Sequence, residues 1–329
     1  MSTPRFLVTM PLPDPAHSIL SRAGSVEVWR DDVHPQNLSH AVASGDYSVV
    51  LTQLTDLLDV EVLASARLDG ISNYAVGFDN IDIAAATARG IMVANTPGVL
   101  TAPTADIAML LILATARRCV EGDSLVRSGS FAGWRPDLLL GHDVAGASLG
   151  LIGTGRIAAA TGRRAAGFDM EVRHCSARGP RDTVRAGDHA VSLGTRLSFD
   201  ELIETSDFIS VHVPATPSTH HLIDSAALSR MRRNAILVNT ARGPVVDEEA
   251  LVHALRNGQI GGAGLDVYEN EPHITPGLAQ LRNTVLLPHL GSATIAVRAR
   301  MAELCAVNAV AMARREVPPH PVNPEAWHV

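Results

Sequence analysis

The chain has 329 residues, of which 46% are hydrophobic and 19% charged, and its formal net charge is −7. This length predicts two domains that each bury a core of their own, and the composition is typical of a globular α/β protein. The net negative charge argues against nucleic acid or an anionic membrane as the main partner.

Neither the start of the chain nor its cysteines indicates export. The first residues contain no long apolar segment, so we expect no signal peptide. The longest apolar run, 107–116, is too short to span a bilayer. The cysteines Cys119, Cys175 and Cys305 are odd in number and follow no metal-ligand spacing, which favours a reducing, cytoplasmic location.

The first hundred residues alternate between strand-like and helix-like segments. The segments that read as strands are 6–10, 26–29, 47–51 and 91–94. Helical segments such as 81–89 fall between them, and this alternation predicts a parallel sheet.

A long helix is predicted from Thr101 to about Val120, with Thr101 as N-cap and Pro103 in its first turn. Its surface is apolar nearly all round and therefore needs cover on every side. We favour a subunit interface, and a wholly internal helix is the alternative. The segment 121–147 that follows reads as loop-rich, and a second alternating block then runs from 147 to about 288.

The second block opens on a glycine-rich sequence, LGLIGTGRIAAA over 149–160. Gly153 allows a tight turn, Gly155 lets the backbone approach a pyrophosphate, and Ala158 permits close helix–strand packing. The helix N-terminus offers free N–H groups to the anion. Because a strand precedes this sequence and a helix and a second strand (170–175) follow it, the pattern indicates a dinucleotide site.

Three ionisable residues follow strand-like segments later in this block: Arg242, Glu271 and His289. In open α/β sheets the carboxyl ends of the strands face the ligand crevice, so these side chains could converge beside a bound nucleotide. Taken singly, each is more commonly a surface or capping residue. The pair His220–His221 suggests a metal, but no third ligand stands at a supporting spacing, and we predict no metal site.

With these motifs in order, the chain resembles the NAD(P)-dependent D-isomer-specific 2-hydroxyacid dehydrogenases. The resemblance rests on the glycine fingerprint, NTARG at 239–243, GLDVY with a later Glu-Pro at 264–272, and PHLGS at 288–292. It covers essentially the whole chain and is nearest to the glyoxylate/hydroxypyruvate reductase branch.

The resemblance implies two doubly wound, parallel-sheet domains of Rossmann or flavodoxin-like type with an active-site cleft between them. Residues 1–100 with 290–329 would form the substrate-binding domain, and 101–289 the dinucleotide-binding domain. It also implies a homodimer formed through helix 102–120 and loop 121–147 of the cofactor domain.

The resemblance further implies roles for the three ionisable residues. His289 matches the general acid that gives a proton to the substrate carbonyl, and Glu271 matches the carboxylate that orients it. Arg242 matches the residue that binds the substrate carboxylate. Substrate contacts are also implied for the backbone N–H groups of Val76 and Gly77. A further one is implied for Trp134, acting across a dimer.

The expected reaction is reduction of a small 2-keto acid by NADPH. The residues expected to contact the cofactor are Gly153, Thr154, Gly155, Arg156, Ile157, Ser176, Ala177, Arg178, Val213, Pro214, Thr240, Ala241, Asp266 and Gly291. NAD-preferring relatives carry an aspartate at the position of Ser176, whereas here Arg178 and Arg181 follow it. We therefore predict NADP(H) in preference to NAD(H), the alternative being that these arginines are solvated loop charges.

Other functions remain open at this point. D-lactate and D-3-phosphoglycerate dehydrogenases share the motifs, although the regulatory extension of the latter is missing. Phosphite dehydrogenases carry a lysine where this chain has Val76, which argues against that activity. The C-terminal-binding-protein corepressors share the fold but act as nucleotide-sensing scaffolds, and turnover would separate them from an enzyme.

Overall fold

The computed structural model describes residues 3–30, 35–177, 183–186 and 189–327. The chain divides into two compact units, 1–100 with 293–329, and 101–292. Each unit is built on a parallel sheet flanked by helices, so the predicted α/β class with two doubly wound sheets is confirmed.

The first unit contains a five-stranded parallel sheet in the order β2-β1-β3-β4-β5. Its strands are β1 (Arg5–Val8), β2 (Ser25–Val28), β3 (Val49–Thr52), β4 (Gly70–Asn73) and β5 (Met92–Ala94). Its helices are α1 (Ala16–Ala23), α2 (Pro35–Ser44), α3 (Val60–Ala64), α4 (Ile83–Ala88) and α11 (Ile295–Ala313), with a 3₁₀ turn η3 (Pro324–Trp327). Helices α1 and α11 share one hydrophobic cluster, and α2, α3 and α4 share another, so both faces of the sheet are covered.

The second unit contains a seven-stranded parallel sheet in the order β10-β7-β6-β11-β12-β13-β14. Its strands are β6 (Ser148–Ile152), β7 (Glu171–Cys175), β10 (Thr195–Arg196), β11 (Phe208–Val211), β12 (Ile236–Asn239), β13 (Gly262–Leu265) and β14 (Thr284–Leu286). The short strands β8 (Thr183–Ala186) and β9 (His189–Ser192) form a separate antiparallel pair.

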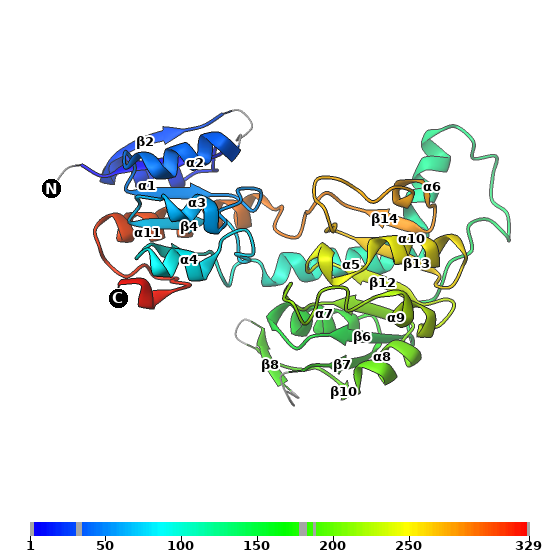
Figure 1. The fold of residues 1–329 in the computed structure, drawn as a ribbon. Coiled ribbons are helices and arrows are strands. Elements are labelled where there is room, and N and C mark those ends of the chain that lie inside the picture. Colours follow the sequence, from blue (N-terminus) through cyan, green and yellow to red (C-terminus); the bar gives the residue numbers. More distant parts are fainter. Residues whose placement is uncertain (1–2, 31–34, 178–182, 187–188, 328–329) are drawn as a thin grey trace. The chain divides into compact units, whose positions relative to one another are not determined.

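Helices cover both faces of this second sheet as well (Figure 1). They are α5 (Thr101–Ala116), α6 (Cys119–Arg127), α7 (Arg156–Ala166), α8 (Phe199–Thr205), α9 (Ser225–Arg230) and α10 (Glu248–Arg256), with 3₁₀ turns η1 (Gly243–Val245) and η2 (Leu278–Gln280). Helices α5 and α7 share one core cluster, whereas α8, α9 and α10 share the other. The strongly apolar α5 is therefore largely internal to its own unit.

The predicted helix from Thr101 to Val120 is confirmed as far as Ala116 and is wrong beyond that residue. Helix α5 ends at Ala116, and Arg118 adopts a left-handed conformation with φ of 52° before α6 begins. The Arg118 guanidinium donates to the carboxylate of Glu121 at 2.7 Å, which holds the break in place. The segment predicted as loop-rich from 121 consequently begins with two turns of helix.

Residues 117–143 form an arm that includes α6 and contains no fully buried side chain. Large apolar side chains lie exposed along it, among them Val126, Phe131 and Trp134, the last with 82% of its surface accessible. No helix in the described part of the chain is both long and apolar enough to cross a bilayer.

Candidate active site

The glycine-rich segment forms the predicted strand–turn–helix. Strand β6 leads into Gly153, whose φ of 110° favours glycine. A Cβ at Gly153 would lie 2.6 Å from the carbonyl oxygen of His212, so this turn also passes close to the end of β11. Ala158, in the first turn of α7, is fully buried, as close helix–strand packing requires.

The residues present at this edge fit a dinucleotide. Helix α7 begins at Arg156, and its N-cap residue Gly155 makes no side-chain cap, so N–H groups of the first turn are left for an anion. A Cβ at Gly155 would meet no atom within 4 Å, which leaves open space where a pyrophosphate would lie. The hydroxyl of Thr240, at the end of β12, is buried and has no hydrogen-bond partner among the described residues.

The other predicted cofactor residues lie on loops that leave the same edge of the sheet. Ser176 and Ala177 follow β7, Val213 and Pro214 follow β11, and Ala241 follows β12. Parallel strands bring these carboxyl ends to one side of the second unit. Arg178 and Arg181 lie outside the described residues.

The structure brings Arg242, Glu271 and His289 together within the second unit. The Nδ1 atom of His289 lies 3.0 Å from Oε2 of Glu271. Burial by itself raises the pKa of Glu271. Hydrogen bonds from His289 and from the Tyr268 N–H, together with the charges of His289 and Arg242, outweigh burial, so the pKa is lowered below its usual 4.5. The carboxylate therefore stays ionised beside the imidazole, which suits a histidine that holds and delivers a proton.

A second histidine at this edge is unsuited to that task. His212 follows β11, and its Nε2 atom lies 2.9 Å from the Ser210 hydroxyl. Desolvation by burial lowers the pKa of His212 to about 4, so this ring stays neutral at neutral pH.

Backbone contacts hold His289 in an unusual conformation. Its φ is 56°, in the left-handed region that side chains rarely adopt. The carboxylate of Asp266 accepts hydrogen bonds from the N–H groups of Leu290 at 2.6 Å and Gly291 at 2.8 Å. Asp266, one of the residues expected to contact the cofactor, therefore fixes the loop that carries His289.

Tyr268 connects the two members of the Glu271–His289 pair, and sequence reasoning missed it. Its backbone N–H donates to Oε1 of Glu271 at 2.9 Å. Its hydroxyl donates to the carbonyl of Leu287 at 2.9 Å, two residues before His289. Burial raises the pKa of Tyr268 to about 12, so the hydroxyl remains a donor at working pH.

The loops that follow β12 and β13 are clamped by two glutamates that exchange hydrogen bonds. The Glu269 N–H donates to Oε1 of Glu248 at 2.8 Å, and the Glu248 N–H donates to Oε2 of Glu269 at 3.4 Å. The buried Glu248 carboxylate also accepts from the Thr275 hydroxyl at 2.6 Å. Gly243 passes so close to Tyr268 that a Cβ would lie 1.9 Å from its carbonyl carbon. The segments bearing Arg242 and Glu271 therefore pack as one piece.

The predicted substrate residues of the first unit lie on the loop after β4. The side-chain amide of Asn95 donates to the Val76 carbonyl at 2.7 Å, and that of Asn73 donates to the Gly77 carbonyl at 2.8 Å. Within the described chain, the N–H groups of Val76 and Gly77 donate no hydrogen bond. Hydrogen bonds hold the two carbonyl groups in place and leave both N–H groups available, which suits an anion-binding loop. Trp134 lies on the exposed arm of the other unit.

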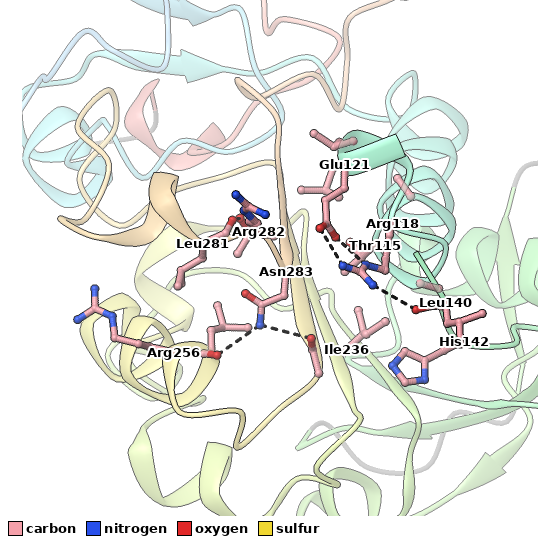
Figure 2. A pocket seen from close by; sticks show the side chains of 18 residues that line it. Thr115, Arg118, Glu121, Leu140, His142, Ile236, Arg256, Leu281, Arg282 and Asn283 are labelled. Atoms are coloured by element: carbon pink, nitrogen blue, oxygen red, sulfur yellow. Dashed lines mark hydrogen bonds and ion pairs between the residues drawn. The ribbon is translucent and has the colours of Figure 1, made fainter. Parts of the chain in front are cut away.

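A pocket of about 510 Å³ lies at the opposite edge of the second sheet (Figure 2). It opens where β12, β13 and β14 begin, and Ile236, Thr284 and Asn283 contribute to its lining. Arg118 lines it too, with its guanidinium paired to Glu121. None of the predicted catalytic or cofactor residues lines this pocket, so it is separate from the candidate active site.

Comparison with known proteins shows the family to which the chain belongs. The family model described as D-isomer specific 2-hydroxyacid dehydrogenase, NAD binding domain, matches residues 109–291. A glyoxylate reductase from Korarchaeum cryptofilum is 46% identical over 99% of this chain and 98% of that protein. A glyoxylate reductase from Thermococcus litoralis is 44% identical, covering 97% of each chain. The predicted family resemblance is confirmed.

Solved structures agree in fold over almost the full length. A protein from Thermus thermophilus superposes with a TM-score of 0.88 at 43% identity, covering 97% of this chain and 99% of that one. An NADPH-dependent glyoxylate/hydroxypyruvate reductase from Sinorhizobium meliloti, solved with NADP and malonate, superposes with a TM-score of 0.84 at 32% identity. That match covers 99% of this chain and 98% of the other.

Proposed function

The chain belongs to the D-isomer specific 2-hydroxyacid dehydrogenases, which are NAD(P)-dependent oxidoreductases, and from this premise we propose that it reduces glyoxylate or hydroxypyruvate. The products would be glycolate or D-glycerate. The observation that carries the proposal is the Glu271–His289 pair at 3.0 Å, with the Arg242 charge acting on the same carboxylate. Relatives named glyoxylate reductase, matched over nearly the whole chain, support the choice of substrate.

In the proposed mechanism Arg242 binds the substrate carboxylate. A planar guanidinium matches a carboxylate in two parallel hydrogen bonds, which also orients the neighbouring carbonyl. That Val76 and Gly77 add backbone donors to the same carboxylate remains a prediction from the family resemblance.

His289 is the proposed general acid. The reduced nicotinamide, when bound, supplies the hydride that ends on the carbonyl carbon. His289 gives its proton from Nε2 to the carbonyl oxygen, because its Nδ1 faces Glu271. Glu271 fixes the ring orientation and stabilises the imidazolium before transfer.

A panel of 2-keto acids measured with NADPH and with NADH tests this function directly. We expect the highest kcat/KM for glyoxylate or hydroxypyruvate, with pyruvate and phosphite oxidation as comparisons. His289→Ala should lower kcat by about 100- to 10,000-fold, the usual contribution of a positioned acid. Near-normal turnover by this variant would remove His289 from the mechanism, and no turnover with any keto acid would favour a nucleotide-sensing scaffold.

We propose a preference for NADP(H) over NAD(H). Ser176 stands where an acidic residue would repel a 2′-phosphate, and Arg178 and Arg181 follow it in the sequence. The NADPH-dependent relative from Sinorhizobium meliloti supports this preference. Arg178→Ala should raise KM for NADPH more than KM for NADH, and equal effects on both would refute the assignment.

We also propose that the chain forms a homodimer through residues 102–147, which include most of α5 and the whole arm 117–143. Leu110 on α5 is 48% exposed, and Val126 on the arm is 60% exposed, so both lack apolar cover within the described chain. Light scattering of the purified protein should give twice the mass of 34.8 kDa, and Val126→Asp should weaken the association. A monomer at all concentrations would refute this proposal.

We further propose that the protein is located in the cytoplasm. All three cysteines are free, and Cys175 and Cys305 are buried as thiols. Burial raises their pKa values to about 11 and about 12, so neither is activated for disulfide exchange. Cell fractionation tests the location.

A further inference from the structure

Two imidazoles and a carboxylate gather outside the catalytic residues described above. His220, His221 and Glu269 each offer one ligand atom, and these atoms all lie within 4.8 Å of one another. Nε2 of His221 lies 2.6 Å from Oε1 of Glu269, and the two histidine rings stack with centroids 4.0 Å apart. Glu269 lies 48 residues after His221, on the loop that follows β13. The spacing around the histidine pair in the sequence therefore gave no sign of this third ligand.

The cluster is held by its surroundings before any ligand arrives. His221 has a φ of 49°, and its backbone N–H donates to the Pro244 carbonyl at 2.8 Å. The Glu269 backbone is fixed by the buried Glu248 carboxylate. Oδ2 of Asp247 lies 4.0 Å from Nδ1 of His221, the ring nitrogen that faces away from Glu269. A carboxylate beside the second nitrogen of a ligating histidine is the arrangement that orients metal-bound imidazoles.

We propose that His220, His221 and Glu269 bind a divalent transition-metal ion, Zn²⁺ fitting best, with water completing the coordination. Two nitrogen donors and one carboxylate oxygen suit zinc and its neighbours, whereas Mg²⁺ and Ca²⁺ favour sites built from oxygen. Ligands at ~2.0–2.1 Å from a tetrahedral Zn²⁺ are about 3.3 Å from one another. To bind the ion, Nε2 of His221 and Oε1 of Glu269 therefore have to move apart by less than about 1 Å. The hydrogen bond between them is then replaced by one metal bond from each atom.

A metal ion at this site would stabilise the loop that carries Glu271, and it would take no part in the proposed reaction. Glu269 lies two residues before Glu271, and its backbone is part of the clamp with Glu248. An ion that binds the folded chain and not the unfolded one raises the unfolding temperature by mass action.

The test uses the full-length, tag-free protein after dialysis against a chelator. Calorimetric titration with Zn²⁺ should show one ion bound per chain, and Co²⁺ should give the visible absorption of a nitrogen- and oxygen-ligated site. Zn²⁺ should also raise the unfolding temperature, whereas Mg²⁺ should not.

Two variants remove ligands, and a third serves as the matched control. His220→Ala deletes a side chain that makes no hydrogen bond within the described chain, so the metal-free fold should be unchanged. Glu269→Gln keeps an acceptor for His221 and loses the charge. Each should weaken Zn²⁺ binding by at least about ten-fold, since even the loss of a group behind a ligand costs that much. His253→Ala removes an exposed histidine of α10 outside the cluster and should bind Zn²⁺ as the parent does.

Two results would overturn the proposal. The first is the absence of saturable Zn²⁺ binding by the parent protein. The second is undiminished binding by both His220→Ala and Glu269→Gln, which would place the ion elsewhere. Because the readouts are stoichiometry, spectrum and unfolding temperature, the outcome does not depend on the proposed reductase activity.

Discussion

Replacing Tyr268 by phenylalanine removes a single hydroxyl and leaves the ring in place. That hydroxyl donates to the Leu287 carbonyl at 2.9 Å, and Tyr268 is only 8% exposed. A hydrogen bond of this kind contributes about 0.5–1.5 kcal/mol net, so we expect the free energy of unfolding to fall by about 1 kcal/mol. In a unit of this size the unfolding temperature should drop by about 2–4 °C.

We expect Tyr268→Phe to lower kcat as well as stability. Leu287 lies two residues before His289, so releasing its carbonyl loosens the segment that positions the imidazole against Glu271. A misplacement of about 1 Å can cost 100-fold, and we expect kcat to fall by about ten-fold, with KM for NADPH unchanged. That change corresponds to about 1.4 kcal/mol in the activation barrier. Steady-state reduction of glyoxylate, followed by the loss of NADPH absorbance, measures it.

Tyr47→Phe provides the matched control. Tyr47 is also 8% exposed, and its hydroxyl donates to the Glu27 carboxylate at 2.8 Å within the first unit. Because its acceptor is a carboxylate, this variant should lose at least as much stability as Tyr268→Phe, and it should keep its kcat. If Tyr268→Phe lost stability and also kept parental kcat, as Tyr47→Phe should, the role of Tyr268 in positioning His289 would be refuted.

Three further predictions concern the second unit. Arg242→Ala should raise KM for the keto acid with KM for NADPH unchanged, since each charge-assisted hydrogen bond is worth about 1.5–3 kcal/mol; an unchanged kcat/KM would show that the carboxylate binds elsewhere. Gly155→Ala should leave the unfolding temperature unchanged, because its Cβ meets no atom within 4 Å, yet weaken NADPH binding in a fluorescence titration. The lowered pKa of Glu271 means that its carboxylate stabilises the fold above pH 4.5 and loses that effect as the pH falls through the lowered value. Unfolding curves of the parent and Glu271→Gln, distinct at neutral pH, should therefore converge in acid, and a constant difference would contradict this.

Features set by neighbouring residues were readable from the sequence. The β6–α7 turn depends on Gly153 and the residues beside it. The break between α5 and α6 was not predicted, because neither a glycine nor a proline marks it, although the apolar run 107–116 ends there. It occurs at Arg118, not at a glycine, and a contact with Glu121 holds it.

The contacts that support the candidate site were harder to foresee. The Tyr268–Leu287, Glu248–Glu269 and His221–Glu269 hydrogen bonds join residues that are 19, 21 and 48 positions apart. Side-chain hydrogen bonds between loops leave no periodic signal in the sequence, unlike the alternation that marks strands. The positions of Glu271 and His289 were therefore predictable as motifs, whereas the groups that hold them were not.

The two hydrogen bonds exchanged between Glu248 and Glu269 have a consequence for local dynamics. Backbone amides in loops ordinarily show the fastest hydrogen exchange in a protein, because no hydrogen bond protects them. Here the Glu269 N–H is bound to a carboxylate that is only 2% exposed. Deuterium should therefore enter this loop amide as slowly as it enters the adjoining strands, and one opening event should release both loops together.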